Sequence, residues 1–358
     1  MQFATFSHVW AKQGMAPSER IELLMRELEL CDELGFDYAF FVEHHFTPNE
    51  SWMPAPGLAI AAAAGRTSRI RLGPMGYVAP LHQPLRLVEE VAWLDQLTGG
   101  RLELGVVPGI SPYFFEPFEA DFKNRRAWTR ELVEFAVTAL SAEGEFEFEG
   151  EHIHQRPVEL GVTSHQRPHP PIWWETRDPD TLAYLAANGI STGYFIIMPR
   201  REVAPRYRDF LERWNQAGHS KRPRMAFWSL IYVDETDEMA LEKALPHALE
   251  AHELFFSIGP GANQANYVEL FKRRGEPGAA EIAQNMTNAD YLLENDLVLI
   301  GSPDTVARKI EAAAEEGFFN TLFCEFNFGE LAEADVMRSI RLMGESVIPQ
   351  LRDLDVAG

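Results

Sequence analysis

Two adjacent histidines that follow an apolar run are the strongest candidates for chemistry in this chain. Residues 37–42 (DYAFFV) have the composition of a buried strand, and Glu43-His44-His45-Phe46 comes directly after them. Because an imidazole ring changes its charge near neutral pH, His44 and His45 are candidate general acids or bases. Both rings could instead be hydrogen-bonded around a loop in a purely structural role.

A metal site at these histidines is the less favoured alternative. Adjacent residues on an extended chain point to opposite faces, so the rings of His44 and His45 would not converge on one ion. The sequence also contains no downstream set of His, Asp and Lys that would complete such a site. We therefore expect no bound metal.

Positively charged residues occur in two windows where an anion could bind. Lys123-Asn124-Arg125-Arg126 opens one expected helix, and Thr176-Arg177-Asp178 lies between an apolar run and a helix that begins at Pro179. Helix N-terminal amides, guanidinium groups and a threonine hydroxyl are the donors that a phosphate monoester needs. The first window could equally form a solvated helix face. The second, at a strand-to-helix junction, is the better candidate for an anion site.

Segments typical of strands and of helices alternate along the chain and decide where these groups lie. We expect strands over residues 2–7, 37–42, 70–78, 101–107, 172–175, 193–197, 225–233 and 321–326, with helices between them. This alternation predicts parallel strands with helical crossovers. About eight strand–helix pairs favour a single (β/α)8 TIM barrel over residues 1–358, whose functional residues follow the carboxyl ends of the strands.

Residues 257–295 do not fit a plain strand–helix unit. The segment is rich in glycine, proline and asparagine and precedes the last expected strand. We expect an insertion on the loop side of the barrel, either a mobile lid or a disordered surface loop.

Charge and composition exclude several classes of partner. The 358 residues carry a net charge of −22, a field that repels nucleic acid and anionic membrane surfaces. Two cysteines and no signal-like N-terminus favour the cytoplasm, and no apolar run is long enough to span a membrane. There is no G-x-G-x-x-G turn after a first strand, so any redox chemistry would use a flavin without the protein's own nicotinamide site.

Five segments, in order, resemble the bacterial luciferase-like flavin monooxygenases. They are GFDYAFFVEHHF (residues 35–46), RIRLGPMGYVAPLHQPLRLVEEVAWLDQLTGGRLELGVVPG (69–109), KNRRAW (123–128), PPIWWETRDPDTL (170–182) and GSPDTV (301–306). The resemblance implies a single-domain barrel, commonly a homodimer, that receives reduced FMN from a separate flavin reductase. Reaction with O2 would give a flavin hydroperoxide that oxidises a small organic substrate, whose identity the sequence leaves open.

The resemblance also assigns roles to particular residues. His44 matches the family's catalytic histidine, with His45 beside it as the next candidate. The Met75-Gly76 segment matches the bulge, often containing a cis peptide, on which the isoalloxazine rests. Arg126, Thr176 and Arg177 match regions that bind the FMN phosphate, and Val107 and Glu175 are expected beside the cofactor at the ends of two strands.

One departure and two alternatives qualify this expectation. Val107-Pro108 stands where luciferase has Cys-Arg, which removes a phosphate contact and a thiol, so we do not expect light emission. A deazaflavin-dependent oxidoreductase of the same fold is the first alternative. A catalytically silent flavin-binding subunit is the second, and the retention of His44 argues against it.

Overall fold

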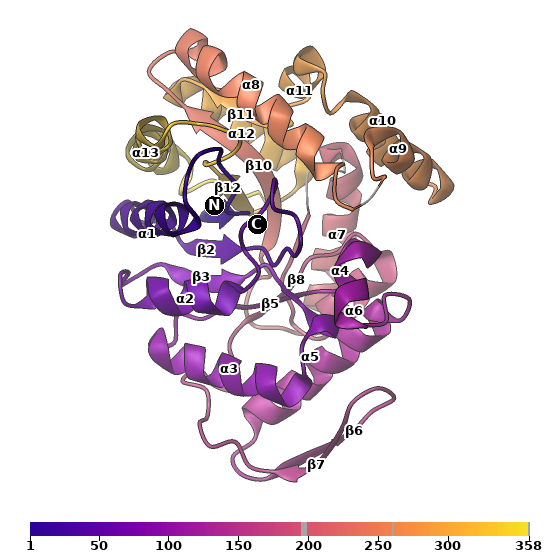
Figure 1. The fold of residues 1–358 in the computed structure, drawn as a ribbon. Helices are drawn as coiled ribbons and strands as arrows, with labels where there is room; N and C mark the ends of the chain where they lie inside the picture. Colours follow the sequence, from indigo (N-terminus) through magenta and orange to yellow (C-terminus); the bar gives the residue numbers. More distant parts are fainter. Residues whose placement is uncertain (195–198, 260, 357–358) are drawn as a thin grey trace.

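The computed structural model describes residues 1–194, 199–259 and 261–356 (Figure 1). Its strands are β1 (Gln2–Ser7), β2 (Tyr38–Phe41), β3 (Arg71–Pro74), β4 (Tyr77–Val78), β5 (Leu104–Val107), β6 (Phe146–Glu149), β7 (His154–Val158), β8 (Ile172–Trp174), β9 (Thr192–Tyr194), β10 (Met225–Val233), β11 (Val298–Gly301) and β12 (Thr321–Glu325). Its longer helices are α1 (Pro17–Glu33), α2 (Pro56–Ala64), α3 (Pro84–Leu97), α5 (Arg125–Ser141), α6 (Pro179–Ala187), α7 (Arg200–Gln216), α8 (Asp237–Phe255), α9 (Gln264–Arg273), α10 (Pro277–Asn285), α12 (Pro303–Gly317) and α13 (Glu333–Leu342). Shorter helical segments are η1 (Ala79–Leu81), α4 (Pro112–Phe115), η2 (Glu116–Phe118), α11 (Ala289–Glu294), η3 (Met343–Val347) and α14 (Ile348–Leu351).

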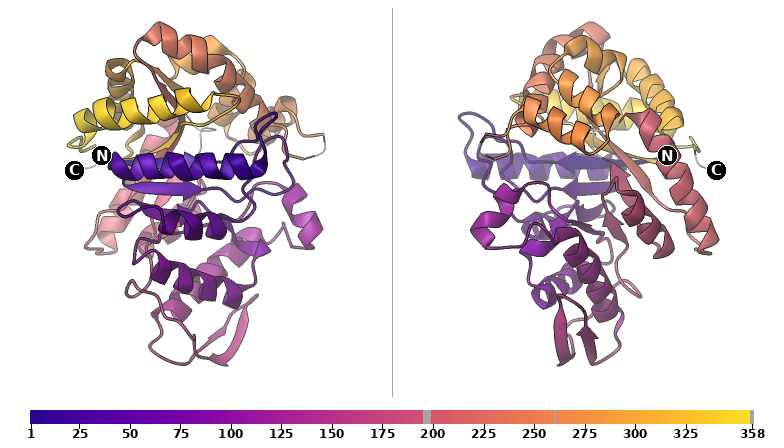
Figure 2. Two further views of the ribbon diagram at one scale, coloured as in Figure 1. Left: turned by 60° about the vertical axis from the view of Figure 1, so that its left-hand side comes forward. Right: turned by 90° about the vertical axis from the view of Figure 1, so that its right-hand side faces the viewer.

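Parallel strands form a curled sheet with helices around it (Figures 1 and 2). Its order is β11-β10-β12-β1-β2-β3, with β9 also paired to β10, and a second parallel sheet has the order β4-β5-β8. Single parallel bridges, Leu72 to Leu102 and Trp173 to Ser191, connect the two sheets. The chain therefore has an α/β fold built on a curled parallel sheet, whereas closure into an eight-stranded barrel stays a prediction.

Large aromatic side chains fill the space enclosed by the curled sheet. Phe6, Phe40, Trp173 and Phe323 come from β1, β2, β8 and β12 and are almost completely buried. The Phe323 ring centroid lies 5.0 Å from that of Phe40 and 5.6 Å from that of Phe6, and Phe40 lies 5.3 Å from Trp173. Strands buried on both faces need continuous apolar runs, and all nine residues of β10 are buried. This aromatic layer closes the interior beneath the carboxyl ends of the strands.

The structure corrects several expected elements. The strand expected over residues 70–78 is divided into β3 and β4, and the Met75-Gly76 peptide bond between them is cis, as the family resemblance implies. The strand expected over 193–197 is described as β9 only through Tyr194, and residues 195–197 lie outside the described residues. Strand β11 was not expected, because its four residues follow the glycine- and asparagine-rich segment. The antiparallel hairpin β6–β7 projects away from the sheet in both views (Figure 2).

The segment over residues 257–295 is largely helical where it is described. It contains α9, α10 and α11, and the side chain of Gln264 donates to the Ala283 carbonyl at 2.7 Å, which ties α9 to α10. Figure 1 shows these helices together on one flank of the sheet. The prediction of a structureless loop is therefore wrong for the described residues, whereas mobility of the segment as a lid stays a prediction.

Two features of the composition can be followed into the structure. Cys31 and Cys324 are buried free thiols, and burial raises the pKa of both well above the usual value. The thiols are therefore poorly placed for nucleophilic chemistry.

Across the described part of the chain, no helix combines the length and apolar character needed to cross a bilayer.

Candidate active site

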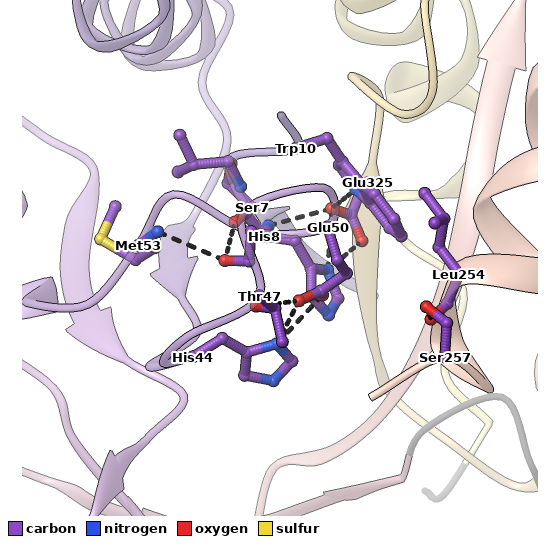
Figure 3. Close-up of polar contacts among 12 residues, drawn as sticks. Ser7, His8, Trp10, His44, Thr47, Glu50, Met53, Leu254, Ser257 and Glu325 are labelled. Carbon is purple, nitrogen blue, oxygen red and sulfur yellow. Dashed lines mark hydrogen bonds and ion pairs between the residues drawn. The ribbon is translucent and has the colours of Figure 1, made fainter. Parts of the chain in front are cut away.

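His44 lies just beyond the carboxyl end of β2 and pairs with Glu50 (Figure 3). The Nδ1 atom of His44 is 3.0 Å from both carboxylate oxygens of Glu50, which also accepts a hydrogen bond from the Thr47 hydroxyl at 2.9 Å. Burial opposes ionisation of Glu50, but His44 and the neighbouring donors outweigh it and lower the pKa of this carboxyl. An anionic Glu50 keeps the proton on Nδ1, so Nε2 is the nitrogen left to exchange a proton with a bound molecule.

His45 belongs to a separate network centred on Glu43. The buried Glu43 carboxylate lies 2.9 Å from Nε2 of both His45 and His82 and accepts the backbone N–H of Val78 at 2.7 Å. Burial disfavours the charged carboxylate, yet these contacts still lower the pKa of Glu43. The two predicted catalytic histidines therefore point into different networks, as alternation along an extended chain requires. A catalytic role for His45 stays a prediction.

Met75, Gly76 and Val107 lie together on the wall formed by the ends of β3, β4 and β5. The backbone N–H of Met75 donates to the Phe41 carbonyl at 2.6 Å, which places the cis peptide beside the end of β2. A Cβ atom at Gly76 would lie 2.8 Å from the carbonyl carbon of Gly105, so this backbone approach requires glycine. Val107 is the residue opposite Val78 in the β4–β5 pairing. The structure thus places three of the predicted cofactor contacts at the ends of neighbouring strands.

Arg126, Thr176 and Arg177 come together where the first turn of α5 meets the loop after β8. Nη1 of Arg126 is 3.4 Å from Oδ1 of Asp178, and the Thr176 hydroxyl accepts the backbone N–H of Asp178 at 3.1 Å. Arg206 from α7 donates to the Arg177 carbonyl at 2.6 Å. Arg126 is 56% exposed and Arg177 is 27% exposed, so both guanidinium groups remain accessible to an anion.

Arg177 also connects this corner to the helical segment that follows α8. Its Nη1 lies 3.6 Å from Glu276, and its guanidinium carbon is 5.0 Å from the Phe271 ring centroid. Arg125, the neighbour of Arg126, is directed elsewhere, because it donates to the carbonyls of Gly109 and Phe122. Only the second arginine of that window therefore faces the predicted anion site.

Glu175 is half-buried and precedes Thr176 in the loop after β8. We call the group formed by Arg126, Thr176 and Arg177 the cationic corner. It follows Trp174, which β8 places beside Val106 of β5. Loss of hydration raises the pKa of Glu175 to about 8, although the charge of Arg177 opposes the shift. A carboxyl with this pKa holds its proton at neutral pH and can donate a hydrogen bond.

Five residues of the site were not identified from the sequence. His8 and Glu325 form a buried pair next to His44, Glu50 supports His44, His82 supports Glu43, and Arg206 supports the cationic corner. His8 directly follows β1 and Glu325 ends β12, so both lie at the strand ends where the sequence predicts functional residues, although neither was given a role from it. The others become visible only in three dimensions.

His8, His44 and Glu50 form one compact polar group. A ring nitrogen of each histidine and a carboxylate oxygen of Glu50 all lie within 4.8 Å of one another. The Nδ1 atoms of both histidines are already hydrogen-bonded to carboxylates, Glu325 for His8 and Glu50 for His44. We therefore treat the group as a hydrogen-bonding cluster, and the expectation that no metal is bound stays a prediction.

A comparison with models of protein families identifies the family of this chain. The model described as luciferase-like monooxygenase matches residues 1–320. The chain belongs to the luciferase-like monooxygenase family. The resemblance inferred from its five segments is thereby confirmed.

Relatives of this chain include an alkanal monooxygenase and a trigonelline monooxygenase. This luciferase-like chain is 29% identical over 361 residues to an alkanal monooxygenase alpha chain of Photorhabdus luminescens, covering 99% of this chain and 98% of the relative. It is 28% identical over 246 residues, 67% of each protein, to the oxygenase component of a flavin-dependent trigonelline monooxygenase of Acinetobacter baylyi.

Solved structures agree on the luciferase-like fold. The monooxygenase RslO1 of Streptomyces bottropensis is 25% identical with a TM-score of 0.84, over 98% of this chain and 99% of that one. The oxygenating constituent of 3,6-diketocamphane monooxygenase of Pseudomonas putida, in complex with FMN, is 21% identical with a TM-score of 0.78 over 98% of both chains. An F420-dependent secondary alcohol dehydrogenase is 17% identical with a TM-score of 0.72 over 98% of this chain and 99% of that one. The last two likenesses concern the fold alone.

Proposed function

We propose that this protein is the oxygenase component of a two-component system that uses reduced FMN and O2 to oxidise a small organic substrate. Membership of the luciferase-like family supports the reaction class, and the relative named as an oxygenase component supports the division into two components. The observation in this chain that carries the proposal is that the Arg126 side chain reaches Asp178 in the loop after β8, the loop that also contains Thr176 and Arg177.

The donors at this corner fit the phosphate of FMN. A protein of net charge −22 needs local positive charge to hold a dianionic phosphate monoester. Two accessible guanidinium groups and a threonine hydroxyl supply the charge-assisted hydrogen bonds that such a group needs. Bound there, reduced FMN would supply the electrons that activate O2.

The remaining residues of the site have separate tasks in this proposal. Nε2 of His44 takes or returns a proton, while Glu50 keeps the other ring nitrogen protonated. Met75, Gly76 and Val107 provide the wall for the isoalloxazine, and the protonated carboxyl of Glu175 donates a hydrogen bond beside it.

The source of electrons leads to the first experiment. Because the sequence lacks G-x-G-x-x-G, we expect the purified protein with FMN and O2 to oxidise no NADH by itself. Adding a generic flavin reductase should start oxidation of a competent substrate from a panel of aldehydes, ketones and aromatics. Sustained NADH turnover without the reductase would contradict the proposal.

Such a reductase partner and two free cysteines fit the cytoplasm, which we propose as the location.

A deazaflavin-dependent oxidoreductase is the second candidate function. Two structural neighbours, a tetrahydromethanopterin reductase and a secondary alcohol dehydrogenase, are F420-dependent enzymes, with TM-scores of 0.70 and 0.72. Such an enzyme would transfer hydride without O2, so product formation under strict anaerobiosis with reduced F420 would favour it.

The finer architecture is also a proposal. We infer a closed (β/α)8 barrel in a single domain, because the bridges at Leu72–Leu102 and Trp173–Ser191 link the two parallel sheets on both sides of β5–β8. We further propose that residues 257–295 act as a mobile lid, because Glu276 and Phe271 contact Arg177 of the cationic corner. Hydrogen exchange in this segment should slow when FMN binds.

A homodimer is the remaining proposal. Leu58 of α2 and Trp93 and Leu97 of α3 are apolar side chains that are 74%, 55% and 48% exposed. Exposed apolar groups that gather on neighbouring helices are typical of an association surface. Light scattering should give twice the chain mass, and Trp93→Glu should shift the protein to monomers.

A further inference from the structure

A second histidine–carboxylate pair lies against the His44–Glu50 pair. His8 is 3% exposed, and its Nδ1 lies 2.8 and 2.9 Å from the two carboxylate oxygens of Glu325. Figure 3 shows the two pairs side by side at the ends of β1, β2 and β12. The ring centroids of His8 and His44 are 5.3 Å apart in an edge-to-face arrangement. The two imidazoles are therefore close enough for the charge on one to affect the other.

Glu325 holds the His8 ring in a fixed orientation. Its oxygens accept the backbone N–H of His8 at 3.0 Å and the indole N–H groups of Trp10 at 2.6 Å and Trp228 at 3.0 Å. These donors lock the carboxylate, which in turn keeps a proton on Nδ1 of His8. A ring that only filled space in the core would not need a carboxylate partner that is itself held by three further donors.

The surroundings of His8 favour its charged form. Burial by itself would lower the pKa of His8, but the carboxylates of Glu325 and Glu50 outweigh burial, and the pKa is raised. Among the described residues, the titratable groups that face His8 are Glu325 from β12 and Glu50 and His44 from the loop after β2. Aromatic rings cover its other sides, those of Phe6, Trp10, Trp228 and Phe255.

We propose that His8 is a positioning residue for His44: as a cation held by Glu325, it keeps the neighbouring imidazole neutral and able to accept a proton. Two positive charges about 5 Å apart repel strongly in a buried site, so a proton on His8 disfavours a second proton on His44. Glu50 lies close to both imidazole rings, and its carboxylate adds to the stabilisation of the positive charge on His8. The functional part of this inference rests on the proposed role of His44.

The direct test is an NMR titration of the histidine side chains in the cofactor-free protein, which requires no activity. In wild type, His8 should remain protonated at pH values where His44 is neutral. In His8→Gln, the midpoint of the His44 titration should rise by about one pH unit or more, because a unit charge roughly 5 Å away has at least that effect at an effective dielectric constant of ~20. By reciprocity, His44→Gln should raise the His8 midpoint by the same amount.

The matched control is His82→Gln, which removes a partly buried histidine from the separate Glu43 network and should leave the His44 midpoint unchanged. An equal His44 midpoint in wild type and His8→Gln would overturn the proposal. If His8→Gln does not fold, the wild-type titration decides alone, since a His8 that is neutral throughout pH 6–8 is incompatible with it.

A second readout connects the charge to the reaction. In His8→Gln, the acid limb of the pH profile of product formation should move upward by the same amount as the His44 midpoint. A merely structural His8 would lower the yield equally at all pH values. If the NMR midpoints shift while no FMN-dependent activity exists in wild type, the coupling stands and the proposed monooxygenase function fails instead.

Discussion

The Glu43 and Glu50 networks use the same residue types but differ in the elements that they connect. Glu43 is bound by His45, His82 and a backbone N–H, and these contacts tie the end of β2 to β4 and η1. Glu50 is bound by His44 and the hydroxyl of Thr47, and both partners come from its own loop. The His44 side chain keeps 13% of its surface exposed. The first network joins elements of the scaffold, and the second presents an oriented ring nitrogen.

Substitution of the two adjacent histidines should separate these roles and give the largest effect. His44→Ala should leave FMN affinity nearly intact and lower product formation about a hundredfold or more, the usual contribution of a general acid or base. His45→Ala should reduce the free energy of unfolding while the product yield per folded protein changes much less. Full product formation by His44→Ala would reassign the role, with His45 the next candidate.

Substitutions in the cationic corner should change the affinity for reduced FMN rather than the rate of the chemical step. A hydrogen bond to a charged group is worth roughly 1.5–3 kcal/mol, so Arg126→Ala and Arg177→Ala should each weaken reduced FMN about ten- to a hundredfold. Reduced riboflavin lacks the phosphate and should bind wild type and variants equally in an anaerobic titration. Equal FMN affinity in wild type and the double variant would place the phosphate elsewhere, with Lys123 and Arg125 next in line.

A matched pair of glutamine variants compares the two carboxylates in stability. Glu43→Gln should reduce the free energy of unfolding by about 1–3 kcal/mol at pH 7, because two histidines and a buried amide lose an anionic partner. The pKa of Glu43 is lowered from its usual 4.5 in the folded protein, so this contribution is present above pH 4.5 and declines as pH falls through the folded value. Urea titrations should therefore show the two proteins converging in acid.

Glu50→Gln completes that comparison. It should impair product formation more than Glu43→Gln does, because the neutral amide no longer favours the proton on Nδ1 of His44. A larger catalytic loss in Glu43→Gln, at equal amounts of folded protein, would contradict the division between a structural and a chemical network.

Glu175 should show the opposite pH dependence. Burial raises its pKa from 4.5 to about 8, so the folded protein holds a proton that the unfolded chain releases above pH 4.5. Wild type should therefore lose stability relative to Glu175→Gln as pH rises from about 4.5 to about 8. Parallel stability curves for the two proteins across this range would show that Glu175 ionises normally.

Much of the architecture follows from the periodicity of apolar residues. The nine-residue β10 and the order of strands and long helices agree with their apolar runs. Two strands are different. The two residues of β4 continue an apolar run that the sequence joins to β3, and β11 follows the segment rich in glycine and asparagine. The break between β3 and β4 was expected only from the family resemblance, whereas the close approach of Gly76 to Gly105 of β5 involves residues far apart in the sequence.

The residues of the site divide in the same way, into those that the sequence could identify and those that it could not. His44, the Met75-Gly76 segment and the cationic residues lie in segments that carry the family resemblance. The His8–Glu325 pair joins residues 317 positions apart, and it forms only because β1 and β12 are neighbours in the curled sheet. Predicting it would have required the sheet order and its register as well as the polar residues at strand ends.

The most direct measurement of the central claim is an anaerobic equilibrium titration of the protein with reduced FMN and with reduced F420, each followed by tryptophan fluorescence. The account predicts that reduced FMN binds tightly, that inorganic phosphate competes with it, and that Arg126→Ala/Arg177→Ala abolishes this competition. Tight binding of reduced F420 with no measurable binding of reduced FMN would contradict the assignment as an FMN-dependent monooxygenase.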